Sequence, residues 1–587
     1  MRHYYSAERH TEILIALMKF HNVRKIIASP GTTDCCFVGS VQHDKWFEMY
    51  SSVDERSAAY MACGMAAESG EPVAIVCTGA TASRDYMPGL TEAFYRQLPV
   101  LAITTTQHRG RIGNGYSQVV DRSVYPKDVA RRSINVDAVH TPEDEWACSV
   151  AINKALIDLR RNGGGPVHIN LTTTYSPDFS IETLPEVTGI LYTDNTDNMP
   201  SLEKYKRIAI LVGAHGKWTD KLSHSVEAFC NIYNAVVLMN HASNYKGKYG
   251  VNHAIIINMK DYTSPNRNAD LVIYIGSISR YPSGMNKRGC EMWRVNPDGE
   301  IRDFEKKTTR VFAMTEETFF AYYVEGKKTT NADDKNSFAF SLQREYIEIM
   351  DKANETPFSN VWVASHTIGS LPDGCVFHLA GSNTARAWNF FKLPNGVECY
   401  SNDGVMGIDG QVSSLIGESL VSPDRLHFGV VGDLTFFYDM NSIGNRHVGN
   451  NIRLMVINNG KGAEFKIYTH ACYQFGNDAE PYMAAAGHFG NKSHALLKHY
   501  AQDLGFEYLC ANTKDEFLES VTRFLTPSLT DKPMLFEVFT DSADESGAIY
   551  LMNHIVHDKA TMKRRMKAMV KSVLPDGVIA MLKKIKH

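Results

Sequence analysis

Two pairs of polar residues, each directly after a short apolar run, are the clearest chemical feature of the sequence. Gly432-Asp433 closes the run "LHFGVV", and Asn458-Asn459 closes the run "IRLMVI". Both runs have the length and composition of buried strands, and "LTFFYDMNSIGN" between them predicts a helix, so the segment is typical of a strand-helix-strand unit of a parallel sheet. Because ligands bind where such strands end, we expect the Asp433 carboxylate and an Asn amide oxygen to meet there.

Carboxylate and amide oxygens are hard ligands that suit an octahedral Mg²⁺ ion, which commonly holds phosphate oxygens as well. Thr435, just after the first turn, adds a hydroxyl and the N–H groups of a helix start to the same anion. Either pair alone is more often a plain turn or loop. The two pairs together favour a site for a metal ion and a diphosphate.

A second candidate is Glu55, at the start of "ERSAAYMACGMAAES", a predicted helix rich in Ala and Gly. Small side chains let another element approach a helix closely, which would place the Glu55 carboxylate in a partly desolvated position. Taken alone, a surface acid near a helix N-terminus, stabilised by the helix dipole, is the commoner explanation.

Length and composition indicate a large globular protein. The chain has 587 residues, 44% of them hydrophobic and 21% charged, and a formal charge of −4 that points to no particular partner. It lacks an apolar run of the roughly 20 residues that cross a bilayer and lacks a secretory signal, so we expect a cytoplasmic protein. The 11 Cys are scattered without C-x-x-C spacing, which predicts neither a zinc site nor a disulfide framework.

The strand-like and helical runs group into three α/β segments, each expected to hold a doubly wound parallel sheet. We place the first at residues 1–185, a central one at 200–350 and the third at 355–545. The stretch "ETLPEVTGILYTDNTDNMPS" reads as the linker after the first. The first and third segments could be distant copies of one design.

Residues 546–587 are predicted to form a C-terminal extension with a strongly basic end. A basic amphipathic end can bind a membrane surface or a nucleic acid. The favoured interpretation is a solvated helix that packs on the rest of the same chain or on a neighbouring subunit. We expect no binding to nucleic acid.

Several motifs in order, "SPGTTD", "VDERSAAYMACGMAAESGEPVAIVCTGATA", "GGPVHINL", "SNDGVMGIDGQVSSLIGES", "GVVGDLTFFYDMN" and "INNGKG", together resemble the thiamine-diphosphate-dependent decarboxylase and carboligase superfamily. The resemblance covers nearly the whole chain. Its nearest branch is the menaquinone-pathway synthase family that makes succinyl-enolpyruvyl-hydroxycyclohexene carboxylate; acetolactate synthase and pyruvate decarboxylase are more distant.

The resemblance implies a role for each matching position. Glu55 would hydrogen-bond N1′ of the cofactor's aminopyrimidine, which promotes loss of the thiazolium proton. Asp433, Asn459 and the main-chain carbonyl of Lys461 would hold magnesium, although the family usually has Gly at the third position. The residues implied to bind the cofactor are Thr78, Ser382, Ile408, Gly432, Asp433, Leu434, Thr435 and Asn459, with Ile408 as the bulky residue that supports its bent conformation.

The remaining implied residues face the reacting carbons or the substrate. Gln118 and Glu464 are the further catalytic candidates, with Glu464 a general acid or a group that orients an acceptor; a solvent-facing loop position is about as plausible for it. The substrate candidates are Thr33, Arg386, Asp403 and Phe465. The first segment of one subunit would bind the pyrimidine and the third segment of its neighbour the diphosphate, which implies a homodimer or homotetramer. The central segment binds FAD in some relatives, and we expect no FAD here.

The chain departs from the menaquinone branch at cationic positions. Thr33 and Asp403 stand where that branch carries Arg, "GSISRYPS" lacks its Lys-Arg pair, and only Arg386 remains. Replacing Arg by Asp inverts a local charge, so a dianionic acceptor should be repelled at Asp403. The cofactor chemistry would be kept and the substrate changed, towards a hydroxylated or aldehyde acceptor.

The sequence therefore predicts an enzyme that decarboxylates a 2-oxo acid with thiamine diphosphate and Mg²⁺ and transfers the acyl group to an acceptor. The alternative within the class is decarboxylation that releases an aldehyde. A nucleotide-binding oxidoreductase is disfavoured, because no G-x-G-x-x-G follows a strand with an acidic residue about 20 positions later. A non-catalytic subunit is disfavoured by the joint presence of Glu55, Asp433 and Asn459.

Overall fold

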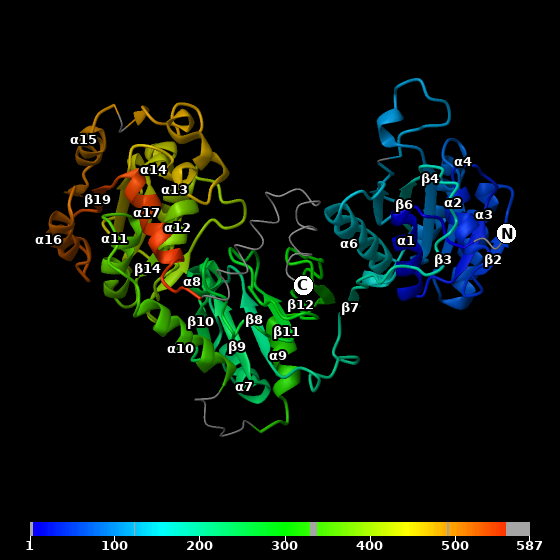
Figure 1. Cartoon of the computed structure of the whole chain (residues 1–587), viewed down its shortest axis with the longest axis horizontal. Coiled ribbons are helices and arrows are strands. Elements are labelled where there is room, and N and C mark those ends of the chain that lie inside the picture. The colour runs from blue at the N-terminus through cyan, green and yellow to red at the C-terminus, as the bar shows by residue number, and fades with distance from the viewer. Residues whose placement is uncertain (1–3, 123, 329–336, 490–491, 559–587) are drawn as a thin grey trace, which may run out of the picture. The chain divides into compact units, whose positions relative to one another are not determined.

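The computed structural model describes residues 4–122, 124–328, 337–489 and 492–558. Of the C-terminal extension predicted over residues 546–587, residues 559–587 lie outside these ranges. Contacts divide the chain into two compact units, one of residues up to 199 with 292–314 and one of residues 200–291 with 315 onward. Figure 1 labels many of the helices and strands of both units.

The first sheet has six strands, in the order β2 (Glu48–Ser51), β1 (Lys25–Ala28), β3 (Val73–Cys77), β4 (Val100–Thr106), β6 (Val167–Thr172) and β5 (Arg132–Val136). Its helices are α1 (Arg9–Phe20), α2 (Cys35–Val41), α3 (Glu55–Ser69), α4 (Ala82–Asp85), α5 (Met87–Tyr95) and α6 (Pro142–Asp158). Alternate residues of β3 enter two different apolar clusters: Ala74 joins one and Ile75 the other. Such a strand is buried on both faces, which explains its unbroken apolar sequence.

The second sheet has the order β10 (Gly250–Asn252), β9 (Ala235–Met239), β8 (Ile208–Val212), β11 (Leu271–Ile275), β12 (Glu291–Val295), β13 (Thr308–Phe312) and β7 (Leu191–Thr193). Its helices are α7 (Asp220–Tyr233), α8 (Ala254–Asn258), α9 (Glu316–Val324) and α10 (Phe338–Met350). The stretch predicted as a linker therefore contains an edge strand, β7. Ile190, directly before β7, is buried in a small apolar cluster with Ile157, Ile301 and Val311. Because the segment is otherwise polar and contains Pro, its sequence gave no sign that it packs against the core.

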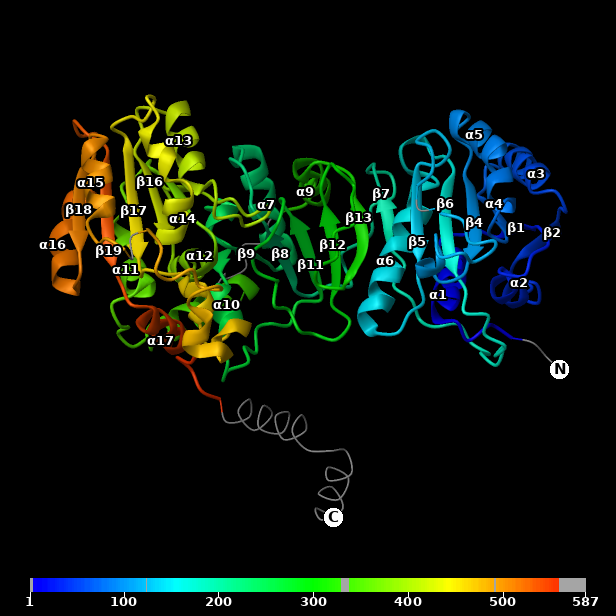
Figure 2. The same cartoon turned by 90° about the horizontal axis from the view of Figure 1, so that it is seen from above.

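The third sheet has the order β15 (Glu398–Tyr400), β14 (Val376–Leu379), β16 (His427–Gly432), β17 (Ile452–Asn458), β19 (Met534–Phe539) and β18 (Glu507–Ala511). Its helices are α11 (Asn360–Thr367), α12 (Ser382–Trp388), α13 (Gln411–Val421), α14 (Asp433–Tyr438), α15 (Leu496–Asp503), α16 (Lys514–Phe524) and α17 (Ser542–Asn553). Figure 2 shows β16, β17, β19 and β18 side by side, with α15 and α16 beside β18.

All described strand pairings inside the three sheets are parallel, which confirms the predicted α/β class. The first and third sheets share one strand order when their strands are numbered from the start of each, 2-1-3-4-6-5. This shared topology agrees with the idea that the two segments are copies of one design. The segment boundaries themselves stay a prediction, and α17 runs across the one placed at residue 545.

The helix α3 forms and packs as its small residues predict. Asp54 caps it by accepting the Arg56 N–H at 3.0 Å, and Gly70 ends it in a left-handed conformation at φ +65°. A Cβ added to Gly89 of α5 would lie 2.5 Å from the Ala59 Cβ and 2.9 Å from its carbonyl carbon. The two helices therefore approach closely only because position 89 lacks a side chain.

We expect Gly89→Ala to destabilise the protein by about 1–3 kcal/mol, because the new methyl group overlaps the α3 backbone, which cannot move aside locally. Gly64→Ala within α3 is the matched control, since an added Cβ there meets no atom within 4 Å. The control should be neutral or more stable by up to about 1 kcal/mol, through helix propensity. Urea unfolding of both variants measures the difference; equal stabilities would contradict the close packing.

Candidate cofactor site

The predicted diphosphate site lies at the carboxyl edge of the third sheet. The strands β16 and β17 are adjacent and parallel, with Gly432 opposite Ile457, so the residues after both strands meet at one edge. A cavity of about 140 Å³ opens there. Ten of the residues predicted from the sequence line it: Ser382, Ile408, Gly432, Asp433, Leu434, Thr435, Asn459, Lys461, Glu464 and Phe465.

The two predicted metal ligands carry unsatisfied oxygens. The Asp433 side chain is 4% exposed, and burial raises its pKa to about 7, against the opposing effect of backbone N–H donors from Leu434 and Gly460. No ion pair to Asp433 occurs within the described ranges. The Oδ1 atom of Asn459 is buried without a hydrogen-bond partner there. A divalent cation would satisfy both, so the residues fit magnesium.

The neighbouring residues have different roles in the loop after β17. Asn458 is structural: it donates to Glu537 Oε1 at 2.7 Å and accepts the Gly460 N–H at 3.1 Å. The Lys461 ammonium group is directed to Glu480 at 2.8 Å, and the Lys461 carbonyl accepts one N–H, from Ala463. That carbonyl keeps a second lone pair, which a metal ion can use.

Several residues with left-handed backbones lie at or beside predicted site positions. Ser382 has φ +56°, Met406, two residues before Ile408, has φ +52°, and Gln118 has φ +63°. This conformation is unfavourable for residues with a Cβ and persists where the surroundings impose it, often at functional sites. The helix α14 begins at Asp433 itself and ends at Tyr438, shorter than the sequence predicts, and a 3-10 turn over Met440–Gly444 follows.

In the first unit, Glu55 is the first residue of α3 and is half-buried. The Thr33 hydroxyl contacts those of Thr78 at 2.6 Å and Thr105 at 2.7 Å, and it accepts the Gly79 N–H. Thr33 and Thr78 are therefore brought together where β1, β3 and β4 end, but the Thr33 hydroxyl has internal partners. Gln118 is exposed in a separate loop.

Two buried groups of the first unit escaped sequence reasoning. Asp34 is 2% exposed, and burial, with a smaller effect from the Glu55 charge, raises its pKa to about 7. Arg122 is fully buried and donates to the Asn170 side chain and the Thr105 carbonyl. Single charged residues inside "PGTTD" and "VVDRS" carry no pattern that signals burial.

Two charged substrate candidates are already paired. Arg386 donates to both carboxylate oxygens of Glu464, at 2.9 and 2.7 Å. Asp403 forms a buried ion pair with Arg280, from "GSISRYPS". The inverted charge expected at Asp403 is therefore neutralised within the fold, which sequence reasoning did not foresee.

Glu545 is a further residue that the sequence did not single out. It is fully buried and accepts the Asn360 N–H at 3.0 Å, the Asn383 amide at 3.1 Å and the Thr540 hydroxyl at 2.8 Å. Asn360 and Asn383 both line the cavity. Glu545 therefore positions part of the cavity wall, and burial raises its pKa to about 7.

Glu545 should make the ligand-free protein less stable as pH rises. Burial raises its pKa from the ordinary 4.5 of a glutamate to about 7, so its contribution to stability is complete below pH 4.5 and is lost as pH passes 7. From about pH 5 to about pH 8 the loss is about 3 kcal/mol. Glu545→Gln should remove this pH dependence, because Gln does not titrate. The Asn383 side-chain amide can rotate so that its oxygen accepts a hydrogen bond from the new NH₂ group. Urea unfolding of both proteins at the two pH values measures this; identical pH profiles would contradict it.

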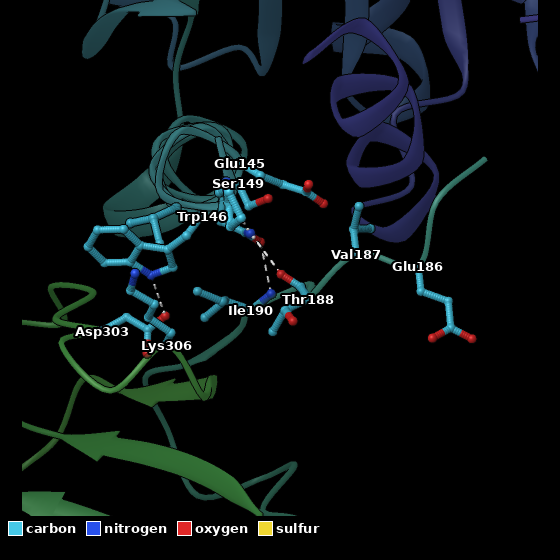
Figure 3. Close-up of a pocket in the computed structure, with 12 residues that line it drawn as sticks. Glu145, Trp146, Ser149, Glu186, Val187, Thr188, Ile190, Asp303 and Lys306 are labelled. Atoms are coloured by element: carbon cyan, nitrogen blue, oxygen red, sulfur yellow. Dashed lines mark hydrogen bonds between the residues drawn. The ribbon is translucent and has the colours of Figure 1, made fainter. Parts of the chain in front are cut away.

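A larger hollow, about 380 Å³, lies in the first unit between α6 and residues 186–190 (Figure 3). Several of its polar groups are paired within the lining: the Trp146 ring N–H donates to Asp303 at 3.0 Å, the Asn153 side-chain N–H donates to the Thr188 carbonyl, and the Asn153 side-chain oxygen accepts the Ile190 N–H. Figure 3 shows Glu186 directed away from it. None of the predicted site residues lines this hollow.

Comparison with known proteins agrees with the fold. Residues 9–124 match the family model described as "Thiamine pyrophosphate enzyme, N-terminal TPP binding domain". A protein of Phocaeicola vulgatus is 30% identical over 94% of this chain and 100% of its own length. Relatives from Bacteroides fragilis (29% identical, 92% and 97% covered) and Flavobacterium johnsoniae (24%, 90% and 95%) are similar over comparable spans.

The fold, the site and the matched domain define an enzyme of the thiamine-diphosphate-dependent decarboxylase and carboligase class. All three relatives are named 2-succinyl-5-enolpyruvyl-6-hydroxy-3-cyclohexene-1-carboxylate synthase. The chain belongs to the family of these synthases. No helix within the described ranges is both long and apolar enough to cross a membrane.

Proposed function

We propose that the chain is a magnesium-dependent carboligase whose substrates differ from those of the named synthases. The observation that carries this proposal is the cavity after β16 and β17. It is lined by the buried Asp433 carboxylate and the Asn459 amide oxygen, and among the described residues the first has no ion-pair partner and the second no hydrogen-bond partner. Asp433, Asn459 and the Lys461 carbonyl would hold Mg²⁺, and Ser382, Gly432, Leu434 and Thr435 would bind the diphosphate.

Thiamine diphosphate, when bound, supplies an electron sink for the carbon that loses the carboxylate. Glu55 would hold a proton at N1′ of the aminopyrimidine, with Thr78 nearby, and Ile408 would support the cofactor from the cavity wall. Gln118 and Glu464 would face the reacting carbons, and Phe465 would exclude water. Arg386, Asp403 and Thr33 remain the proposed substrate residues, the last with its hydroxyl engaged internally.

The net reaction balances without any further reagent: R–CO–COO⁻ + R′–CHO + H⁺ → R–CO–CHOH–R′ + CO₂. One C–C bond to the carboxylate breaks, one forms to the acceptor carbonyl carbon, and the acceptor oxygen takes the proton. By the resemblance described above, the menaquinone branch carries Arg where this chain has Asp403, and this expected difference is the basis for proposing a changed substrate.

We also propose that two chains build each site, in a homodimer or homotetramer, because the resembled family binds the pyrimidine with the first segment of one subunit and the diphosphate with the third segment of its neighbour. FAD forms no part of this proposal, and neither does a nucleic acid or a membrane. A cytoplasmic location fits an enzyme that acts on small 2-oxo acids.

The test uses full-length protein with thiamine diphosphate and Mg²⁺, and first measures cofactor uptake by calorimetry. Pyruvate and 2-oxoglutarate are then supplied with and without an added aldehyde, while CO₂ and the organic products are measured. We expect CO₂ release and a product that contains the acceptor. Release of a free aldehyde despite added acceptor would support simple decarboxylation instead, and failure of cofactor uptake would overturn the proposal.

A further inference from the structure

Ile408 reaches the cofactor cavity from a loop, residues 401–410, that joins β15 to α13. Val405 and Met406 of this loop are exposed, and Met406 has a left-handed backbone at φ +52°. Exposed side chains do little to fix a backbone, and a strained conformation persists only where its surroundings impose it. The loop therefore depends on partners that lie outside it.

The Gly407 carbonyl has such a partner in Gln411, the first residue of α13. The Gln411 Nε2 atom donates to this carbonyl at 2.6 Å, and the Gln411 side chain is fully buried. The carbonyl belongs to the planar peptide group that joins Gly407 to Ile408. A hydrogen bond to its oxygen therefore fixes the plane from which the Ile408 side chain leaves the backbone.

His378, in β14, holds the other end of the Gln411 amide. Its Nε2 atom lies 3.0 Å from Gln411 Oε1, its Nδ1 atom lies 2.8 Å from Glu418 Oε1, and the residue is 1% exposed. Residue 418 follows residue 411 by seven positions, two turns of α13, so both side chains lie on one face of the helix. The imidazole ring is thus held between these two side chains.

These three hydrogen bonds fix where the hydrogens lie. An amide oxygen turned towards Gly407 would set two acceptors against each other, so the Gln411 NH₂ group faces the carbonyl and the Gln411 oxygen faces the ring. The Nε2 atom of His378 must then carry a hydrogen. A second hydrogen lies between Nδ1 and the Glu418 carboxylate, which holds the ring in this orientation.

The orientation of the amide depends on the Nε2 hydrogen. Without that hydrogen, the Nε2 lone pair would attract the Gln411 NH₂ group, and the amide would rotate to set its oxygen against the Gly407 carbonyl. Two buried acceptors in contact are unfavourable, so the peptide group between Gly407 and Ile408 would have to move. The three side chains belong to one compact unit, and none of them is among the site residues predicted from the sequence.

We infer that Gln411, oriented by His378 and Glu418, is a positioning residue that holds the peptide group of Gly407 and, through it, the Ile408 side chain in the cofactor cavity. This inference rests on the proposed function, in which Ile408 supports the cofactor. It assigns the three buried side chains a role in turnover without direct contact with the cofactor or the substrate.

The position of Ile408 is measured by methyl NMR on full-length, ligand-free protein. The protein is labelled at its Ile δ1 methyl groups, and the Ile408 resonance is the one that Ile408→Val lacks. Gln411→Met keeps the length of the side chain and removes both of its hydrogen bonds, so this resonance should shift or broaden. Gln411→Glu sets an oxygen against the Gly407 carbonyl and should change it more. An unchanged Ile408 resonance in both variants would overturn the inference.

Turnover is measured on the holoenzyme with pyruvate or 2-oxoglutarate, whichever releases CO₂. We expect Gln411→Met to lower kcat by about tenfold, the effect of one lost buried hydrogen bond. Cofactor affinity should change by less than about threefold, because Asp433 and Asn459 would still hold the metal and the diphosphate. An unchanged kcat beside a shifted Ile408 resonance would contradict the positioning role.

Two further variants test how Gln411 is oriented. A glutamine in Glu418→Gln can donate to Nδ1 and leave the hydrogen on Nε2, so kcat should fall by less than about threefold. His378→Phe keeps a ring but removes that hydrogen, so it should reproduce the effect of Gln411→Met. Gln502→Glu, at an exposed position of α15, is the matched control for Gln411→Glu and should leave both measurements unchanged. A Glu418→Gln variant as impaired as Gln411→Met would refute the proposed orientation.

The two measurements separate this inference from the function on which it rests. The Ile408 resonance is recorded without cofactor and depends on the three buried side chains, whereas cofactor uptake and CO₂ release depend on the proposed function. Absent cofactor uptake by the wild type would refute the proposed function and the positioning role with it. Intact uptake, with an Ile408 resonance that neither Gln411 variant moves, would refute the inference alone.

Discussion

Replacing Asp433 by Ala is expected to weaken thiamine diphosphate binding in the presence of Mg²⁺ by more than about 100-fold. The Asp433 carboxylate is buried, and none of the ion pairs formed by described residues includes it, so it is available to a divalent ion. Without it the cation loses a charged ligand, and the diphosphate charge is then poorly neutralised in a site that excludes water. Calorimetric titration of cofactor into each protein at fixed Mg²⁺ measures the change.

The loss should not come from unfolding, because removing an unpaired buried carboxylate relieves a desolvation penalty. Thermal melting of the ligand-free proteins checks this. Asp424→Ala is the control, because Asp424 is exposed and precedes β16, the strand that Asp433 follows. This variant should bind thiamine diphosphate as tightly as the wild type does. Asn459→Asp keeps an oxygen ligand and should retain binding within about tenfold. Wild-type affinity in Asp433→Ala would exclude Asp433 as a metal ligand.

The sequence was sufficient to predict the parts of the site that follow local pattern. Two buried apolar runs, each closed by a polar pair, required β16 and β17 to end at one edge, and the structure places Asp433 and Asn459 at one cavity there. The small residues of α3 predicted a closely packed helix that begins at Glu55. In each case the relevant residues are neighbours along the chain or along two adjacent strands.

The parts that could not be predicted depend on contacts between distant residues. Arg280 and Asp403 are 123 positions apart and lie in different predicted segments. The sequence therefore predicted an uncompensated negative charge at Asp403, whereas the structure pairs that charge with Arg280. Glu545 lies at the C-terminal end of its segment and reaches Asn360, 185 positions earlier. The edge strand β7 is only three residues long, too short for a periodic pattern to reveal.

The second large effect is expected for Glu55→Gln, which should lower turnover by about a thousandfold. An amide cannot exchange the proton that the Glu55 carboxyl would hold at N1′ of the aminopyrimidine. Cofactor affinity should change by less than about tenfold, because Asp433 and Asn459 would still hold the metal and the diphosphate. Glu68→Gln, an exposed acid near the far end of α3, is the control and should be fully active. Unchanged turnover in Glu55→Gln would refute its catalytic role.

The same variant decides whether two chains share a site. If Glu55 of one chain acts with Asp433 of another, co-expression of Glu55→Gln and Asp433→Ala chains produces mixed dimers in which one site carries both changes and the other carries none. Random pairing then restores activity to about a quarter of the wild-type value, although each variant alone is inactive. If both residues of a site came from one chain, every site would contain a defect, and the mixture would stay as inactive as its components.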